Sequence, residues 1–535
     1  MTTSPELARH LAAHLAQHLT DIVLCPGSRN SPLSLALLAR DDIRVHVRID
    51  ERSAAFLALG LARATGRPAG VVVTSGTAVA NCHPAMIEAR YSHVPLVIIS
   101  GDRPPRLHGT GANQTIEQHN VLGVATCEIA ELADFSTLDF TQGATHINVA
   151  FDEPLLTTPE ALEPVILETA QPQRTAFVDY GEIALDISRN TLVIAGDEAW
   201  EVPGLEDVPT IAEPSAPAPY NPVHPLAANV FHADSVSAEG YTVTTKPTQV
   251  VVVGHPTLHR GVLQLLQDPE IELYVLSRTD TVTDLAQCRS GLGSRVKVTG
   301  TPTKQWLQVC EAAAQLAADS VRDVLASDYG FTGLHVAAAV ADTLGTNDTL
   351  FLGSSNPVRD ASFVGLPFAG VDCFSARGAA GIDGSVSQAI GIALAQQYKD
   401  ITNIRANRTV ALIGDITFLH EVGGLLTGVD AQPENLTIVV ANDAGGGIFE
   451  TLEIGDAAYR QHFEQAVGTP HQVDFAALAD AYQVEFHQVD TLQSLIEALI
   501  DTTDAGGFHL IEAKTTRSTR RAMHQDLQAR MVFQA

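Results

Sequence analysis

The sequence predicts an α/β protein made of three doubly wound, parallel-sheet domains. Short apolar runs alternate with helical patterns along the chain, and most runs end in loops rich in glycine, serine or asparagine, as in βαβ units. The length of 535 residues is too great for one hydrophobic core, because single cores stop growing at about 250 to 300 residues. We place the domains at residues 1–180, 181–330 and 331–535.

The amino-acid composition excludes several classes of function. The chain has 32 Lys and Arg against 62 Asp and Glu, a net charge of −30, which disfavours binding to nucleic acid or to an anionic membrane. Uncharged apolar runs stay short of the roughly 18 residues that span a bilayer, and residues 1–20 have the pattern of an amphipathic helix instead of a signal peptide. The six cysteines form no CxxC pair, as expected in a reducing compartment. We therefore expect a soluble, cytoplasmic protein without membrane insertion.

The first third contains five strand-like runs separated by helical patterns. These runs are Asp21–Cys25, Arg44–Ile49, Gly70–Thr74, Pro95–Ser100 and His146–Phe151. The proline-bearing segment between Leu156 and Arg174 has no clear period and predicts a linker to the next domain.

Polar side chains follow three of these strands. Ser28 and Arg29 come after the first strand, although a helix cap with an incidental arginine explains them almost as well. Glu51 follows the second strand and begins an alanine-rich helix, where stabilisation by the helix dipole is the simplest explanation. The third strand leads into a loop of small residues that includes Thr77, and such a loop allows the backbone to approach a flat ring.

The middle third also predicts a parallel α/β domain. Its strands are expected at Thr191–Gly196, Gln249–Gly254 and Glu272–Leu276, before alanine-rich helical sequence near Asp319. The proline-rich segment 202–225 predicts a loop. The glycines of this third never form GxGxxG, which disfavours a nicotinamide dehydrogenase.

The final third contains the most informative stretch. After a helix at Gly333–Leu344 and a strand at Leu350–Gly353, the stretch 408–452 predicts strand 410–413, helix 418–426 and strand 436–441. The two strands of this stretch end at Asp415 and at Asn442, so polar side chains lie at the carboxyl ends of neighbouring parallel strands. Ligands bind at such strand ends in open α/β sheets.

The spacing of these polar residues indicates a metal-diphosphate site. Asp415 and Asn442 are 27 positions apart, and with the carbonyl of Ala444 they can ligate an octahedral Mg²⁺ that also binds two diphosphate oxygens. Asp443 in place of Asn442 stays open as the second ligand. The pattern resembles the thiamine-diphosphate motif, although Ile416 replaces the third glycine of Gly-Asp-Gly. An ordinary βαβ unit with an Asp helix cap is the competing interpretation.

Seven motifs in order resemble one family of thiamine-diphosphate enzymes, the 2-succinyl-5-enolpyruvyl-6-hydroxy-3-cyclohexene-1-carboxylate (SEPHCHC) synthases of menaquinone biosynthesis. The motifs are PGSRNSPL (26–33), DERSAAFLALGLA (50–62), VTSGTAVAN (73–81), DRPPRL (102–107), GANQT (111–115), SARGAAGIDG (375–384) and GDITFLHEVGGL (414–425). This family tolerates a bulky aliphatic residue at position 416. The resemblance covers both outer thirds of the chain.

The resemblance implies a pyrimidine-binding first domain, a central domain and a diphosphate-binding last domain. It places active sites between the first domain of one subunit and the last domain of another, so it implies a homodimer or homotetramer. Glu51 is implied to hydrogen-bond N1′ of the aminopyrimidine and thereby to activate the cofactor. The other implied cofactor-binding residues are Thr77, Ser354, Gly414, Asp415, Thr417, Asn442, Ala444, Ile382, Ile448 and Phe449. Mg²⁺ is implied as the metal, with Mn²⁺ left open.

The resemblance also implies the reaction. 2-Oxoglutarate is decarboxylated on thiamine diphosphate, and the succinyl-semialdehyde carbanion equivalent adds in a 1,4 fashion to isochorismate. Arginine suits these substrates because it pairs with carboxylates in a bidentate manner. Arg29, Arg377 and Ser355 are the further implied catalytic residues. The implied substrate-binding residues are Ser28, Arg29, Arg103, Asn113, Gln114, Arg260, Ser355, Arg359, Arg377 and Leu452.

Some points of the comparison stay open. His259 stands where the family leads us to expect a lysine before Arg260, so the role of position 259 is in doubt. Another thiamine-diphosphate 2-oxo-acid carboligase or decarboxylase is the alternative enzyme. A non-enzymatic scaffold of the same fold is a further alternative, although such a protein would be expected to have lost Glu51 or Asp415.

Overall fold

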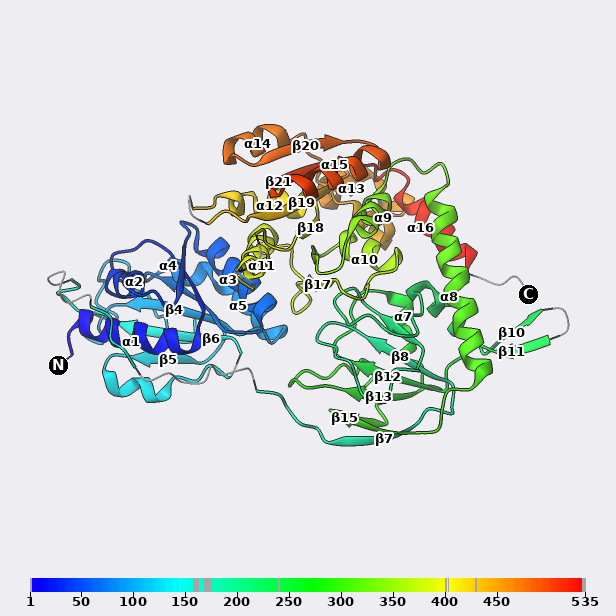
Figure 1. The fold of residues 1–535 in the computed structure, drawn as a ribbon, viewed down its shortest axis with the longest axis horizontal. Helices are drawn as coiled ribbons and strands as arrows, with labels where there is room; N and C mark the ends of the chain where they lie inside the picture. The colour runs from blue at the N-terminus through cyan, green and yellow to red at the C-terminus, as the bar shows by residue number, and fades with distance from the viewer. Residues whose placement is uncertain are drawn as a thin grey trace.

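The computed structural model describes residues 2–141, 143–156, 163–167, 176–238, 241–399, 402, 404–428 and 431–531. Three parallel sheets with helices on their faces form three lobes (Figure 1), and this arrangement confirms the predicted α/β class. The first lobe lies at the left in blue and cyan, the second at the lower right in green, and the third at the top in yellow to red. The linker expected between Leu156 and Arg174 falls largely on residues outside the described ranges.

The first sheet has six parallel strands in the order β2-β1-β3-β4-β6-β5. These strands are β1 (Asp21–Leu24), β2 (Arg44–Val47), β3 (Ala69–Val73), β4 (Leu96–Asp102), β5 (Thr126–Ile129) and β6 (Thr145–Ala150). Val71 and Val73 enter the core on one face and Val72 the core on the other, so β3 reads as a continuous apolar run. Helices α1 (Ser4–His18) and α2 (Ser31–Leu38) cover one face, and α3 (Glu51–Thr65), α4 (Thr77–Asn81) and α5 (His83–Tyr91) cover the other.

The last sheet repeats the strand order of the first. Its six parallel strands run β17-β16-β18-β19-β21-β20. They are β16 (Thr349–Leu352), β17 (Asp372–Ser375), β18 (Thr409–Gly414), β19 (Asn435–Asn442), β20 (Glu485–Val489) and β21 (Gly507–Lys514). The helices of this part are α9 (Gly333–Thr343), α10 (Asn356–Phe363), α11 (Ser385–Lys399), α12 (Asp415–His420), α13 (Arg460–Phe463), α14 (Phe475–Tyr482), α15 (Leu492–Ala505) and α16 (Arg520–Arg530).

The central sheet has five parallel strands in the order β14-β13-β12-β8-β9. They are β8 (Thr191–Ala195), β9 (Thr210–Ala212), β12 (Gln249–Val253), β13 (Glu272–Leu276) and β14 (Gly291–Gly293). β7 (Glu182–Asp186) pairs with β15 (Arg295–Thr299), and β10 (Ser235–Ala238) pairs with β11 (Tyr241–Thr244). The helices are α6 (Ala228–Phe231), α7 (Arg260–Leu265) and the long α8 (Lys304–Leu325), whose Trp306 donates to the carbonyl of Thr191 at 2.7 Å.

Several elements differ from the sequence prediction. The segment 202–225, expected to be a loop, contains the short strand β9. The helix expected at 418–426 is wrong in its bounds, because α12 already ends at His420 and a 3₁₀ helix follows at Val422–Leu425. The break is at Glu421, whose buried carboxylate accepts hydrogen bonds from the hydroxyls of Ser53 and Ser387. No helix within the described ranges combines the length and the apolar character that a membrane span needs.

The first and last domains share one hydrophobic core, which runs across the contact between α3 and α11. The two helices approach so closely that only glycine fits at the crossing. A Cβ on Gly60 of α3 would collide with the carbonyl of Gln388, and a Cβ on Gly391 of α11 would collide with the carbonyl of Leu57. Side chains from the first sheet, both helices and the last sheet therefore pack as one unit.

This contact predicts that Gly391→Ala lowers the thermal midpoint of unfolding. In an isolated helix alanine is more favourable than glycine by about 1 kcal/mol, but overpacking of a core costs roughly 1–3 kcal/mol. Gly423→Ala is the control, because no described atom lies within 4 Å of a Cβ added there. Calorimetry of both variants checks the prediction, and an unchanged or raised midpoint for Gly391→Ala would contradict it.

Candidate active site

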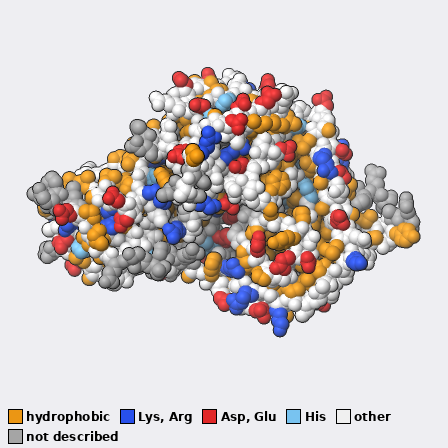
Figure 2. Space-filling model, viewed as in Figure 1, with side chains coloured by type: hydrophobic (Ala, Val, Ile, Leu, Met, Phe, Trp, Pro, Cys, Tyr) orange, Lys and Arg blue, Asp and Glu red, His pale blue; other side chains and the backbone are white. Residues whose placement is uncertain are grey.

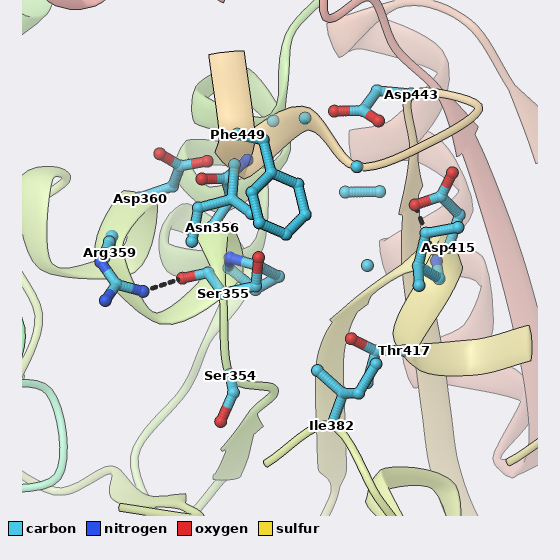
Figure 3. A pocket seen from close by; sticks show the side chains of 18 of the residues that line it. Ser354, Ser355, Asn356, Arg359, Asp360, Ile382, Asp415, Thr417, Asp443 and Phe449 are labelled. Carbon is cyan, nitrogen blue, oxygen red and sulfur yellow. Dashed lines mark hydrogen bonds between the residues drawn. The ribbon is translucent and has the colours of Figure 1, made fainter. Parts of the chain in front are cut away.

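A cavity of about 350 Å³ lies at the carboxyl ends of β16, β18 and β19 (Figure 3). The chain runs from β16 to β17 on one side of it and then crosses back to β18 on the other side of β16. The cavity therefore lies at the point where the strand order reverses. Sequence-predicted site residues that line the cavity are Ser354, Ser355, Arg359, Arg377, Ile382, Gly414, Asp415, Thr417, Ile448, Phe449 and Leu452. All of them belong to the last domain.

Two carboxylates, the buried Asp415 and the half-buried Asp443, lie on the same side of this cavity. Asp415 at the end of β18 and Asp443 beyond β19 both line it, and Figure 3 shows them across from Ser355 and Arg359. Asp415 accepts hydrogen bonds from the N–H groups of Ile416 and Gly445, each at 2.8 Å, and contacts Nε2 of His471 at 2.9 Å. Oδ1 of Asp443 is buried and has no hydrogen-bond partner among the described residues.

The electrostatics of this acid pair favour the binding of a cation. Burial, and next the neighbouring Asp415 carboxylate, raise the pKa of Asp443 to about 7. Burial also raises the pKa of Asp415, despite its hydrogen bonds to His471 and to backbone N–H groups. A divalent cation between two such carboxylates would remove the repulsion between them and give Oδ1 of Asp443 a partner. The donor set is therefore suited to a hard metal ion.

Of Asn442 and Asp443, which the sequence leaves open as the second metal ligand, only Asp443 lines the cavity. Neither Asn442 nor Ala444 belongs to the lining of the cavity. Oδ1 of Asn442 accepts from the N–H of Ala444 at 2.9 Å, and its Nδ2 donates to Glu512 at 2.7 Å, so the side chain turns toward β21. The alternation of side chains along an extended segment then brings Asp443 to the cavity. The residue that faces the cavity is therefore one position later in the sequence than Asn442.

Three glycines, Gly445 to Gly447, allow the backbone beside the acid pair to pass close to neighbouring atoms. A Cβ on Gly447 would collide with the carboxylate of Asp443, and a Cβ on Gly446 would collide with the carbonyl of Val467. The N–H group of Gly445 donates a hydrogen bond to the Asp415 carboxylate at 2.8 Å. This loop leaves room for a ligand that lies directly against the backbone, as phosphate groups do.

The opposite wall carries two arginines of the last domain. Burial, and next the charge of Arg377, lower the pKa of Arg359. Arg359 donates from Nη1 to the carbonyl of Ser355 at 2.6 Å (Figure 3). Ser355 has a φ of 82°, in the left-handed region that non-glycine residues rarely adopt, and such strain is typical of functional sites. The buried Arg377 and the half-buried Arg359 bring two positive charges to one wall, with Glu213 as the nearby negative charge, and this excess favours an anionic ligand.

A second arginine pair lies in the first domain. Burial, and next the charge of Arg103, lower the pKa of Arg29, whose Nη1 donates to the carbonyl of Phe151 at 2.8 Å. Nε of Arg103 is buried without a hydrogen-bond partner in the described part of the chain. Figure 2 shows several basic side chains close to the place where the first lobe meets the others. The positive charges of Arg29 and Arg103 therefore favour an anionic ligand, as those of Arg359 and Arg377 do.

The predicted first-domain residues do not line the cavity around Asp415. Glu51 is half-buried in the first turn of α3, while the side chains of Ser28, Thr77 and Asn113 are exposed. Gln114 donates from Nε2 to the carbonyl of Ser75 at 2.9 Å and so supports the loop that precedes Thr77. Within one chain, the two groups of predicted residues therefore open onto different spaces.

The central-domain residues also lie outside the lining of this cavity. Arg260 is exposed and pairs with Glu453 at 3.2 Å. His259 contacts the hydroxyl of Ser362 at 2.9 Å, and burial, followed by the charge of Arg359, lowers its pKa to about 3. A neutral imidazole in this position provides no positive charge for a carboxylate.

Sequence reasoning missed three residues around the cavity. Asp360 and Arg520 form a buried bidentate ion pair in its lining, with distances of 2.6 and 2.7 Å. His471 contacts Asp415 although 56 residues separate them. A basic cluster at 517–521 in an acidic chain was the only sequence signal for Arg520, and no sequence pattern singles out His471.

Comparison with protein families defines the class. Residues 5–121 match the family described as "Thiamine pyrophosphate enzyme, N-terminal TPP binding domain", and residues 371–513 match "Thiamine pyrophosphate enzyme, C-terminal TPP binding domain". The crystal structure of benzoylformate decarboxylase from Polynucleobacter necessarius has the same fold, with a TM-score of 0.65 and 16% identity over 97% of this chain and 99% of that one. The fold and the two matched domains make the chain a thiamine pyrophosphate (thiamine diphosphate) enzyme.

Closer relatives define the family within this class. SEPHCHC synthases from Corynebacterium diphtheriae and Corynebacterium glutamicum are 62% and 58% identical to the chain, covering 98% and 99% of it and 100% and 99% of the relatives. The same synthase from Mycobacterium avium is 43% identical over 95% of the chain and 96% of the relative. The chain belongs to the SEPHCHC synthase family.

Proposed function

We propose that the chain catalyses the SEPHCHC synthase reaction, in which 2-oxoglutarate is decarboxylated and its succinyl-semialdehyde unit adds in a 1,4 fashion to isochorismate. The charge arrangement in the cavity supports this proposal independently of the relatives. A single cavity combines an acid pair that needs a cation, Asp415 and Asp443, with an arginine pair that needs an anion, Arg359 and Arg377. The first pair suits a metal diphosphate, and the second suits a carboxylate substrate.

The residues that would hold the cofactor fit a metal-bound diphosphate. Asp415 and Asp443 would bind Mg²⁺, and the same one-position change moves the proposed backbone ligand from Ala444 to Gly445, which lines the cavity. The loop 445–447 would lie against the phosphates. Ile382, Ile448 and Phe449 would exclude water from the reacting carbon, since they belong to the apolar part of the lining. Mn²⁺ has the same preference for oxygen ligands.

The proton transfer that starts the reaction is assigned to Glu51. Bound thiamine diphosphate supplies a thiazolium carbon that stabilises the negative charge left by decarboxylation. The carboxyl group of Glu51 would hold a proton at N1′ of the aminopyrimidine and thereby favour its imino form. Glu51 suits this role because it opens the first turn of α3 at the surface of the chain, where a second subunit has access to it.

The arginine pairs would orient the substrates. Arg359 and Arg377, with Ser355, would bind the distal carboxylate of 2-oxoglutarate in the cavity of the last domain. Arg29 and Arg103 of the first domain would bind isochorismate, with help from Ser28, Asn113 and Gln114. Guanidinium groups can form two parallel hydrogen bonds with each carboxylate, which fixes orientation as well as position. A decarboxylase of monocarboxylic 2-oxo acids would have no use for four buried or half-buried arginines at these positions.

We also propose that a second copy of the chain completes each site. In one chain the cavity around Asp415 contains no described first-domain residue, whereas Glu51, Arg29 and Arg103 all belong to the first domain. A symmetric dimer brings the first domain of each subunit to the last domain of the other and forms two equivalent sites. A tetramer would contain two such dimers.

Glu51→Gln should reduce turnover by about 10²–10⁴-fold, the usual contribution of a positioned acid or base. Consumption of isochorismate with 2-oxoglutarate, thiamine diphosphate and Mg²⁺ measures the effect. The variant should still bind the cofactor, because Asp415 and Asp443 are unchanged. Glu201→Gln, at an exposed glutamate of the central domain, is the control. Full activity in Glu51→Gln would remove the assigned proton transfer.

Asp443→Ala should weaken Mg²⁺-dependent binding of thiamine diphosphate far more than Asn442→Ala does. We expect a loss of more than about 100-fold for Asp443→Ala and of no more than about 10–100-fold for Asn442→Ala, since partners outside the metal shell typically change metal affinity by roughly 10–100-fold. Titration calorimetry with the cofactor and Mg²⁺ gives both dissociation constants. The reverse order would restore Asn442 as the ligand.

Two inactive variants should restore activity when they share one dimer. A mixed dimer of Glu51→Gln and Asp415→Ala has one site with an intact first domain and an intact last domain. Random pairing gives about half mixed dimers, each with one of two sites intact, so about a quarter of wild-type activity should return. Co-expression with two affinity tags allows the mixed dimer to be purified, and the purified mixed dimer should have about half of wild-type activity. Each variant alone is the control. A mixed dimer as inactive as its parents would place the site within one chain.

A further inference from the structure

Glu88 of α5 is a buried carboxylate that leaves its own domain to bind the last domain. Only 3% of the residue is exposed. Its Oε1 accepts from the N–H of Gly378 at 3.0 Å, and its Oε2 accepts from the N–H groups of Ala379 and Ala380 at 2.7 and 3.2 Å. Three consecutive N–H groups around one carboxylate form an anion-binding concavity, and charge strengthens each of these bonds.

The loop at 378–380 lies directly on the end of α5. A Cβ on Gly378 would come within 2.6 Å of the backbone nitrogen of Ser92 and within 2.8 Å of the backbone carbonyl of Glu88, so only glycine fits there. Ala380 has a φ of 55°, in the left-handed region. The N–H groups of the loop point to one centre because the chain takes this unusual course, and the carboxylate of Glu88 occupies that centre.

Arg377 immediately precedes this loop and lines the cavity of the last domain. Its Nε and Nη2 donate to the hydroxyl of Thr257, at 3.0 and 2.7 Å, in the central domain. The backbone N–H groups of Thr257 and Leu258 donate to the buried carboxylate of Glu213 at 2.5 and 2.6 Å. The guanidinium is therefore oriented from the central domain, and the backbone after it is held by Glu88 from the first domain.

Arg63 completes the junction of the three domains. It lies in the last turn of α3, with 7% of its side chain exposed, and pairs with Glu88 at 3.1 Å and with Asp197 of the central domain at 3.7 Å. The positive charge of Arg63 therefore lies directly against the Glu88 carboxylate beside the loop. The same guanidinium connects the first and central domains.

We propose that Glu88 is a positioning residue that fixes Arg377 and the adjoining cavity wall by binding the N–H groups of 378–380 from outside the catalytic domain. This inference rests on the proposed role of Arg377 in binding 2-oxoglutarate. It assigns a second duty to the first domain: Glu51 would serve the active site of the partner subunit, whereas Glu88 shapes the cavity of its own chain.

Glu88→Gln is the decisive variant, with Asp21→Asn as its matched control. Glutamine keeps the shape of the side chain but loses the charge, and its NH₂ group would face backbone N–H groups that need an acceptor. Asp21 is also a buried carboxylate of the first domain, 1% exposed and paired with Arg44 at 2.7 and 2.8 Å, but its hydrogen-bond partners do not include the loop 378–380. Both variants lose a buried ion pair, and only Glu88→Gln releases the loop.

Amide hydrogen exchange, steady-state kinetics and cofactor binding are then compared. In Glu88→Gln we expect faster exchange at 378–380 and a rise of about ten- to a hundredfold in KM for 2-oxoglutarate, since displacements of about 1 Å can cost as much. The dissociation constant for thiamine diphosphate should change less than about threefold, because the diphosphate is held by other loops. Asp21→Asn should lower the thermal midpoint without changing either loop exchange or KM.

Two results would overturn the proposal: unchanged loop exchange in Glu88→Gln, or an equal rise of KM in Asp21→Asn, which would make the effect one of general stability. A wild-type chain that does not consume isochorismate would refute the proposed function and not this inference. The exchange comparison needs no substrate, so it still decides whether Glu88 holds the loop.

Discussion

The close contact between α3 and α11 is the constraint on which the rest of the structure depends. Gly60 and Gly391 let the two backbones touch, and one core then joins the first and last sheets. Interiors packed to this density transmit displacement instead of absorbing it. The first domain is therefore held rigidly against the last. In this arrangement the side chain of Glu88 binds the loop that follows Arg377, and Glu51 is half-buried at the start of α3.

The cavity stores unfavourable electrostatics that its ligands would relieve. Asp415 and Asp443 repel each other on one side, and Arg359 and Arg377 repel each other on the other. Glu213 lies near both arginines and His471 contacts Asp415, so these neighbours offset part of the repulsion. The left-handed backbone of Ser355 adds strain at the same place. Binding of a metal diphosphate and a dicarboxylate would neutralise both pairs, so part of the intrinsic affinity comes from relief of repulsion.

The sequence predicts best those elements that are buried on both faces. β12 and β13 have the expected extents to within a residue, because their apolar runs pack on two cores. β5 and β9 escape prediction because β5 is partly exposed and β9 is only three residues long within a proline-rich segment. The break at Glu421 depends on Ser53, which lies 368 residues away in the chain. The choice between Asn442 and Asp443 depends on a turn with a left-handed Ala444, which no local pattern specifies.

Helix α3 connects the two duties proposed for the first domain. It carries Glu51 in its first turn and Arg63 in its last, and its 15 residues span about 22 Å as an α-helix. Gly60 locks the helix against α11 between these points. A shift of α3 along α11 would therefore move Glu51 and the Arg63–Glu88 pair together. In the proposed dimer, where Glu51 serves the site of the other subunit, this packing would tie the geometry of each site to that of the other.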